Sequence, residues 1–310
     1  MKFKSNTIMT EILDNLFKVY ESRVPNVRKI TQAMINEGFV TNQQDIVNDH
    51  IAFRTMGVDN LGIESFEKIF LAHGYSRMNY YHFETKKLDA YWYSPPTDDL
   101  PRVFISELKI ELLSKSAQAI ISKYTDTVDT DPVDCLDLNN VEAVSSFFQT
   151  PLWSIPTKED YEILLSESEY SAWVIYNRYY LNHYTISVHD LPEPFNRLES
   201  FNEFLKSIGI ELNDSGGEIK ISRDGLLKQS SSIANQVEAR FSGGELKTIA
   251  GSYVEFAERS VLPEFINYKK TKLKRKHRRE GFEASNADKI FESTFTSQLK
   301  NKNEKDNRPT

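Results

Sequence analysis

The sequence contains a single cysteine, Cys135, among 310 residues. A disulfide within one chain is therefore impossible, which excludes a small secreted fold held together by such bonds. No segment approaches the roughly 18 consecutive apolar residues from which a membrane-spanning helix is inferred. The N-terminal residues also lack the long apolar run of a signal peptide. We therefore expect a cytoplasmic protein that does not enter membranes.

The composition is that of a globular protein with a sizeable core. Hydrophobic residues make up 39% of the chain and aromatic residues 12%, and the formal net charge is −7. A net negative charge argues against nucleic acid as the main partner. Motifs for nucleotide phosphates are absent, because FSGGELKT at 241–248 lacks the Gly-Lys-Ser/Thr ending of a P-loop. We expect this segment to form a hairpin turn.

One order of elements, a strand, a helix and three strands, occurs twice along the chain. The helical segments IESFEKIFLAHGY and LESFNEFLKSIGI share four of 13 residues at an offset of 135, and the leading strands are offset by 133. The sequence therefore predicts a duplicated βαβββ unit. In the first unit, the expected strands are 48–55, 76–84, 88–95 and 101–110. In the second unit, they are 180–188, 218–225, 226–241 and 249–259, and the helix is 198–210.

Three side chains in these units form a candidate metal site. His50 lies in the first strand of the first unit, His183 takes the matching place in the second, and Glu255 lies in the closing strand. If the two units form a half-barrel, two imidazoles and one carboxylate can bind one face of an octahedral ion, as in non-haem Fe(II) enzymes. From the residues alone, an alternative interpretation is equally good: the two histidines are hydrogen-bonded core residues, and the glutamate belongs to an ion pair.

Other charged residues compete for a role in this site. His82 and Glu84 share a strand face and form an alternative ligand pair, although we favour an exposed strand there. Glu107 is predicted to take the place in the first unit that Glu255 takes in the second. It could be a fourth ligand, a catalytic base that supports the ligands, or a relic of duplication, and we favour the supporting role. Arg54 shares a strand face with His50, since side chains alternate along a strand.

These elements predict an α+β fold in which the two βαβββ units form a half-barrel sheet around a metal. We expect a single catalytic domain over residues 1–298 and a disordered tail at 299–310. The domain begins with a helical N-terminal segment at 1–45 and the first unit at 46–111. A helical insertion at 112–175 separates this unit from the second unit at 176–260. A C-terminal segment at 261–298 is expected to lie over the pocket.

Six sequence motifs resemble the 2-oxoadipate dioxygenase/decarboxylase family of the vicinal oxygen chelate superfamily, over residues 10–298. They are NDHIAFRT, LPRVFISEL, LNHYTISV, DGLLKQSS, GSYVEFAER and REGFEASNADKIFEST. The resemblance implies paired βαβββ units and Fe(II) bound by His50, His183 and Glu255. It further implies that Arg54 binds a substrate carboxylate. A small apolar residue followed by serine would shape the pocket, and the best match is Ala284 with Ser285.

The activity implied by this resemblance is the conversion of 2-oxoadipate and O₂ to 2-hydroxyglutarate and CO₂, a step of lysine catabolism. One alternative is a metal-dependent isomerase or lyase on the same scaffold, with Glu255 or Glu107 as the base. A second is a nucleic-acid-binding protein that uses the basic run at 269–279. The sequence leaves the oligomeric state open.

Overall fold

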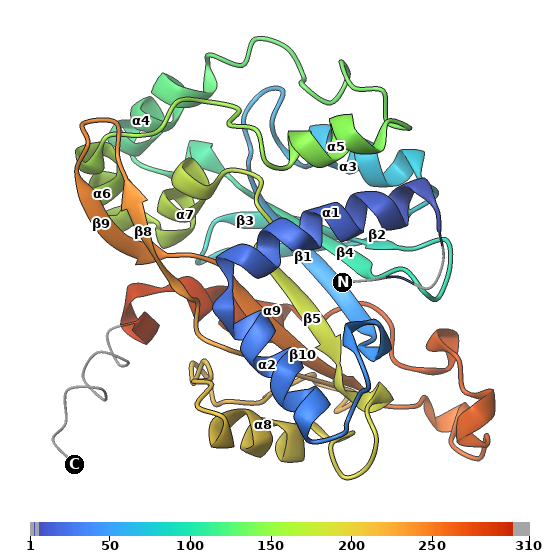
Figure 1. Cartoon of the computed structure of the whole chain (residues 1–310). Helices are drawn as coiled ribbons and strands as arrows, with labels where there is room; N and C mark the ends of the chain where they lie inside the picture. Colours follow the sequence, from blue (N-terminus) through green and yellow to red (C-terminus); the bar gives the residue numbers. More distant parts are fainter. Residues whose placement is uncertain (1–2, 4–5, 300–310) are drawn as a thin grey trace, which may run out of the picture.

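The computed structural model describes residue 3 and residues 6–299, and its centre is a sheet that curls into a half-barrel (Figure 1). Within this part of the chain, the sheet has eight strands in the order β2-β3-β4-β1-β5-β10-β7-β6. The strands are β1 Asn48–Met56, β2 Ser76–Phe83, β3 Leu88–Ser94, β4 Arg102–Leu108, β5 His183–Ser187, β6 Lys220–Ile221, β7 Leu227–Ser231 and β10 Tyr253–Arg259.

The sheet repeats one arrangement on either side of its middle. β4 runs parallel to β1 in the first half, β10 runs parallel to β5 in the second, and β1 pairs with β5 in antiparallel fashion where the halves meet. The helices that follow the leading strands are α3, Ile63–Ala72, and α8, Leu198–Ser207. Their first residues lie 135 positions apart, as the sequence predicts. The duplicated βαβββ fold is therefore confirmed.

The apolar spacing of α3 explains both its helical state and its place. Ile63, Phe66, Ile69 and Phe70 recur at intervals of three and four residues, and all are buried against the core. In contrast, β1 is buried along nearly its whole length, so both of its faces are covered. The polar side chains of β1 therefore need partners inside the protein.

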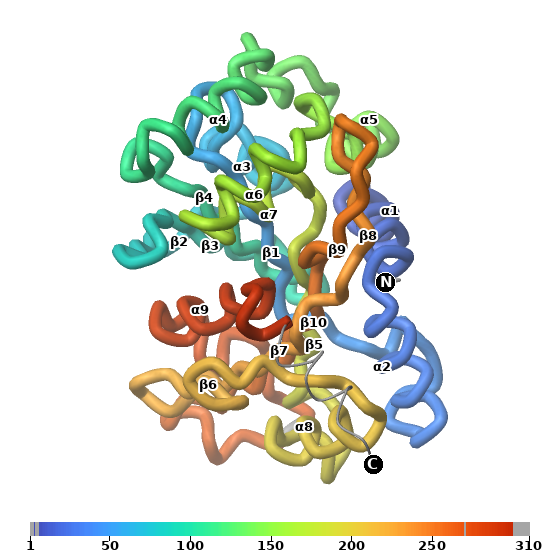
Figure 2. The backbone as a smooth tube through the Cα atoms, turned by 90° about the vertical axis from the view of Figure 1, so that its left-hand side faces the viewer, coloured from blue at the N-terminus to red at the C-terminus, as the bar shows by residue number. Residues whose placement is uncertain are grey.

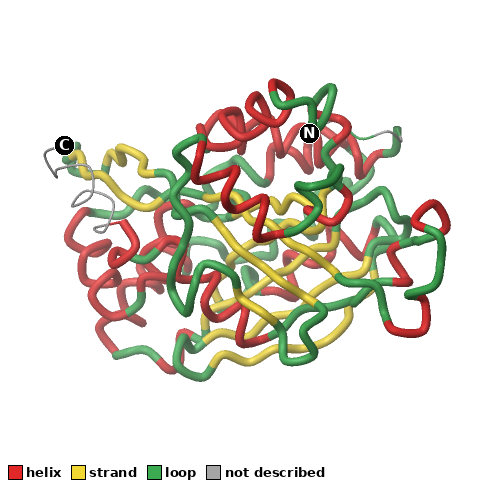
Figure 3. Tube along the Cα trace, turned by 90° about the horizontal axis from the view of Figure 1, so that it is seen from below, coloured by secondary structure: helices red, strands yellow, loops and turns green. Residues whose placement is uncertain are grey.

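Helices cover both faces of the sheet. Figure 2 shows α1 and α2 on one side of the central strands and α9 on the other, and Figure 3 shows the strands running through the middle of the helical layers. The bounds are α1 Ile8–Arg23, α2 Pro25–Asn36, α4 Lys115–Thr125, α5 Val141–Phe147, α6 Lys158–Glu167, α7 Glu169–Asn177 and α9 Ala284–Phe291. Residues 112–175 contain α4, α5, α6 and part of α7.

The second unit departs from the predicted strands in one place. The single strand expected over 226–241 is wrong, because the chain leaves the main sheet after Ser231. Ala234 donates its backbone hydrogen bond to the carbonyl of Ser293, not to a strand. The chain then forms a separate hairpin of β8, Gln236–Arg240, and β9, Leu246–Ala250. The expected hairpin turn within 241–248 is confirmed.

Two further expectations concern the ends of the chain and membranes. Except for Leu299, the tail expected to be disordered lies outside the described residues. None of the helices in the described ranges is long and apolar enough to cross a membrane.

Candidate metal centre

The structure brings His50, His183 and Glu255 together on three neighbouring strands, β1, β5 and β10. One nitrogen or oxygen atom from each side chain lies within 4.8 Å of the other two, and all three residues are buried. His183 Nε2 is 3.0 Å from Glu255 Oε2, and His50 Nε2 is 3.4 Å from Glu255 Oε1. The three predicted ligands therefore form one cluster, and this cluster bridges the two βαβββ units.

The residue before each histidine determines where its ring proton lies. The carboxylate of Asp49 is 2.9 Å from His50 Nδ1, and the amide oxygen of Asn182 is 3.0 Å from His183 Nδ1. An oxygen that only accepts hydrogen bonds requires the ring nitrogen to carry the proton. Each ring, when it is neutral, therefore presents an unprotonated Nε2 to the cluster. The hydroxyl of Thr185 lies 3.0 Å from Nε2 of His50 and can donate to it when the ring is in this tautomer.

The donor atoms at the centre of the cluster fit a divalent cation. In this tautomer, two Nε2 lone pairs face a carboxylate, so three hydrogen-bond acceptors converge with no hydrogen between them. The electrostatic repulsion among these acceptors is removed only when a proton or a cation binds between them. Two ligand atoms at about 2.1 Å from an ion and at right angles to each other are about 3 Å apart. The separations of 3.0 and 3.4 Å from the nitrogens to Glu255 are close to this value.

The same convergence governs the ionisation of the three groups. In the metal-free cluster, burial favours neutral Glu255, but positive charge on protonated His50 and His183 rings outweighs burial and holds the pKa of this carboxyl well below its usual value. For His50, burial is outweighed by the Glu255 and Asp49 carboxylates, so the pKa is raised. For His183, burial prevails and the pKa is lowered. The carboxylate therefore stays charged.

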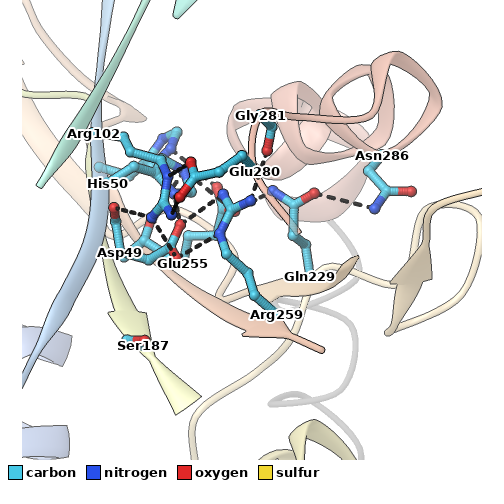
Figure 4. Close-up of polar contacts among 12 residues, drawn as sticks. Asp49, His50, Arg102, Ser187, Gln229, Glu255, Arg259, Glu280, Gly281 and Asn286 are labelled. Atoms are coloured by element: carbon cyan, nitrogen blue, oxygen red, sulfur yellow. Dashed lines mark hydrogen bonds and ion pairs between the residues drawn. The ribbon is translucent and has the colours of Figure 1, made fainter. Parts of the chain in front are cut away.

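Sequence reasoning missed the residues that orient Glu255. Gln229 on β7 donates from its amide to Glu255 Oε1 at 2.7 Å, and Asn286 on α9 donates to the amide oxygen of Gln229 at 3.1 Å (Figure 4). β7 is the neighbour of β10 in the sheet, and Gln229 is buried. In the register of these strands, Ser231 stands directly opposite Glu255, and Gln229 lies two positions away on the same face. The sequence alone gives neither this order of strands nor this register.

A small pocket extends from the cluster to Arg54. It is lined by residues of the half-barrel, among them Ala52, Phe104 and Tyr253, and by residues of the C-terminal segment, namely Phe282, Ala287, Ile290 and Phe291. The ring of Phe282 meets the ring of His50 edge-on at 4.8 Å. The C-terminal segment thus forms one wall of the pocket and shields the cluster from water.

The structure does not bring two further predicted residues into this pocket. α9 begins at Ala284, which is half-buried, while Ser285 is exposed, and neither lines the pocket. The face of α9 that contacts the pocket carries Ala287, Ile290 and Phe291, because residues three and four apart share a helix face. Ala284 and Ser285 therefore do not line the pocket.

Glu107 also lies away from the cluster. Phe104 and Ser106 of β4 face the pocket, so Glu107 points to the opposite side of the sheet. There its carboxylate accepts a hydrogen bond of 2.8 Å from the backbone of Ile63, at the start of α3. In the second unit, Glu255 pairs with Thr185, which lies two positions after His183. In the first unit, the residue two positions after His50 is Ala52, and it pairs with Phe104. Phe104 is therefore the residue that corresponds to Glu255.

The other competing features have partners of their own. His82 is exposed and pairs with Asp89 at 2.7 Å. In the basic run at 269–279, the arginines contact the protein: Arg275 and Arg278 donate to the backbone carbonyls of Leu100 and Arg259, and Arg279 pairs with Asp224. The run therefore does not present all of its charge to solvent.

Comparison with known proteins agrees with this fold. A family model described as 2-oxoadipate dioxygenase/decarboxylase matches residues 12–266. The chloroplastic 2-oxoadipate dioxygenase/decarboxylase of Arabidopsis thaliana is 39% identical, over 96% of this chain and 80% of that protein. A crystal structure of the hydroxyglutarate synthase from Oryza sativa in complex with 2-oxoadipate is 41% identical, with a TM-score of 0.86, and the match covers 93% of this chain and 92% of that one.

A more distant structure supports the fold alone. It is a putative glyoxalase superfamily protein from Ralstonia eutropha JMP134, 21% identical, with a TM-score of 0.68 over 91% of this chain and 90% of that one. This likeness agrees with the predicted vicinal-oxygen-chelate type of half-barrel. The extent of the family match and the identity to the curated relative are decisive for membership, and the chain belongs to the 2-oxoadipate dioxygenase/decarboxylase family.

Proposed function

We propose that this protein is a non-haem Fe(II) dioxygenase that converts 2-oxoadipate and O₂ to 2-hydroxyglutarate and CO₂. The observation that carries the proposal is the convergence of His50, His183 and Glu255 beside a buried arginine without a carboxylate partner. Two histidines and one carboxylate are the ligand set of Fe(II) oxygenases that keep positions open for substrate and O₂. Bound there, the ion would supply the redox chemistry for decarboxylation and hydroxylation of the same molecule.

Arg54 supports a substrate with a second carboxylate. Its side chain is 1% exposed and donates to the hydroxyl of Thr294 at 3.0 Å and to the carbonyl of Phe291 at 3.1 Å. Both acceptors are neutral, and the Nε atom has no hydrogen-bond partner. Within the described residues, no carboxylate lies within 4.0 Å of this guanidinium. A buried cation of this kind is stabilised by an anion with a planar pair of oxygens.

Tyr253 offers a second donor at the same end of the pocket. Its ring stacks on His183 with 4.7 Å between centroids, and its buried hydroxyl has no hydrogen bond of ordinary geometry. Burial raises the pKa of this phenol, whereas the charge of the nearby Arg54 opposes the rise, so the hydroxyl keeps its proton. We propose that the Tyr253 hydroxyl and Arg54 Nε together donate to the distal carboxylate of the substrate.

The wall between the metal cluster and Arg54 suits the methylene chain of such a substrate. Phe104, Phe282, Ile290 and Phe291 give this part of the pocket an apolar surface. A 2-oxo acid would place its oxo and carboxylate oxygens toward the metal cluster, its methylenes along these side chains and its far carboxylate at Arg54. The apolar wall excludes water, which strengthens the ionic contacts at the far end.

Turnover after anaerobic loading with Fe(II) tests the proposal. Oxygen uptake and CO₂ release are measured with 2-oxoadipate, and 2-hydroxyglutarate is identified as the product. We expect one CO₂ per O₂ consumed, and no activity in the variants His50→Ala, His183→Ala and Glu255→Ala. His82→Ala removes an exposed strand histidine outside the cluster and serves as the matched control. Consumption of 2-oxoadipate without O₂ uptake, to a product other than 2-hydroxyglutarate, would instead indicate an isomerase or lyase and contradict the proposal.

We propose the cytoplasm as the location of the protein. Cys135 is exposed and free, which suits a reducing compartment. The name of the Arabidopsis thaliana relative places that protein in the chloroplast. Fractionation of cells that express this chain with a C-terminal tag tests the location.

A further inference from the structure

The two candidate histidine ligands are preceded by different residues at equivalent positions of the repeat. Asp49 precedes His50 and Asn182 precedes His183, with the offset of 133 residues that separates the leading strands. Each accepts a hydrogen bond from Nδ1 of the histidine that follows it. The first unit therefore uses a carboxylate and the second an amide for the same task.

Asp49 is held far more firmly than Asn182. Arg259 donates to both oxygens of the Asp49 carboxylate, from Nε at 2.7 Å and from Nη2 at 2.9 Å, and Arg102 donates from Nη1 at 3.2 Å. Asp49 is 2% exposed, so these contacts are made away from water. By contrast, the amide nitrogen of Asn182 has no hydrogen-bond partner among the described residues.

The two arginines are themselves neutralised and anchored. Arg102 forms a two-pronged ion pair with Glu280, at 2.8 and 2.6 Å, and Arg259 donates to the carbonyl of Gly281 at 2.7 Å (Figure 4). Two buried cations are thus balanced by Asp49 and Glu280. A purely structural ion-pair network would need only this charge balance. Here the Asp49 carboxylate also accepts a hydrogen bond from His50.

We propose that Asp49, clamped by Arg102 and Arg259, is a positioning residue for His50. It keeps the ring proton on Nδ1, aims the Nε2 lone pair at the metal, and makes His50 a stronger electron donor than His183. The physical reason is that a carboxylate polarises the Nδ1–H bond more than an amide oxygen does, and partners of this kind raise the basicity of a histidine ligand. The inference rests on the proposed metal site and deepens it.

The test measures metal binding without O₂ or substrate, so that its outcome is separate from that of turnover. Chelator-treated protein is titrated with Co(II), and the dissociation constant and visible spectrum are recorded for the wild type and for Asp49→Asn. We expect a 10- to 100-fold weaker dissociation constant in the variant, roughly the effect of removing such partners elsewhere. Glu280→Gln alters the exposed end of the same network without touching the bond to His50, and should bind Co(II) within about twofold of wild type.

A spectroscopic measurement separates positioning from mere structural support. In Zn(II)-loaded protein with ¹⁵N-labelled histidine, the Nδ1 proton of His50 should resonate downfield of that of His183, and Asp49→Asn should remove most of this difference. If Asp49→Asn does not fold, Arg102→Gln, which leaves Asp49 with one arginine, should show an intermediate loss of Co(II) affinity.

Three results would overturn the inference: wild-type protein that binds no Co(II), folded Asp49→Asn with unchanged affinity, or equal proton shifts for the two rings in the wild type. Wild-type protein that binds Co(II) but does not turn over 2-oxoadipate would contradict only the proposed function.

Discussion

Replacing Tyr253 with phenylalanine should leave the protein as stable as before, or more stable, while weakening its binding of dicarboxylic substrates. The hydroxyl is buried near Arg54 and Ser293 but makes no hydrogen bond of ordinary geometry, and an unsatisfied group of this kind costs about 1–3 kcal/mol in the folded state. Phenylalanine removes this cost and keeps the ring that stacks on His183. The free energy of unfolding in the absence of ligand should therefore be unchanged or higher by about 1 kcal/mol.

The expected loss of binding follows from the charge of the ligand. A hydrogen bond to a charged group contributes about 1.5–3 kcal/mol, so the dissociation constant for 2-oxoadipate should rise by about 10- to 150-fold. 2-Oxohexanoate has the same chain length but no distal carboxylate, and its dissociation constant should change by less than about twofold, since it has no group for the hydroxyl to bind.

Calorimetry on Co(II)-loaded protein without O₂ measures both dissociation constants, and urea unfolding measures stability. Tyr184→Phe is the matched control, because its hydroxyl is also buried without a hydrogen bond of ordinary geometry but lies outside the pocket. It should bind both acids as the wild type does. Equal weakening of both acids in Tyr253→Phe, or no weakening of either, would refute the reasoning. A loss of more than about 2 kcal/mol in stability would show that the hydroxyl has a partner after all.

Three further outcomes follow from the same geometry. Alanine at His50, His183 or Glu255 should abolish divalent metal binding in a folded protein, as judged by metal content after gel filtration. Arg54→Lys should lose most of the preference for 2-oxoadipate over 2-oxohexanoate in steady-state assays, because the planar fork is lost, and retained preference would exclude Arg54 as the anchor. Burial opposes the ionisation of Asp49, but Arg259 and Arg102 hold its pKa well below 3.8, so its contribution to stability is present above that pH and lost as the pH falls through the folded value. In metal-free Asp49→Asn, the free energy of unfolding should therefore fall less steeply than in the wild type as the pH is lowered. Urea unfolding between pH 2 and 7 measures this dependence.

The parts of the fold that the sequence predicts are those encoded by local periodicity. The helices after the leading strands are found within three residues of their expected ends, because their apolar residues recur at helical spacing over a full face. The repeat then places His50 and His183 at matching positions without any knowledge of tertiary contacts. The clustering of the ligand residues was accessible from sequence for this reason.

The errors arise where strand register or helix phase decides the outcome. Residue type matches Glu107 to Glu255, but the pairing of β4 with β1 puts Phe104 at that place. Asp49 was overlooked because strict alternation sends it to the face opposite His50. The pairing of β1 with β5 is irregular between Asn48 and Ile51, and this irregularity accompanies the contact of the Asp49 carboxylate with its neighbour's ring. Neither feature has a local sequence signal.

The meeting of the two βαβββ units at β1 and β5 has a mechanical consequence. His50 comes from the first half of the sheet, whereas His183 and Glu255 come from the second. A cation bound by all three therefore acts as a reversible crosslink across the seam, closing a chain loop of more than a hundred residues. Loading with metal should slow hydrogen exchange in β1 and β5 together, and a chain cut between the two units should reassemble more tightly when the ion is present.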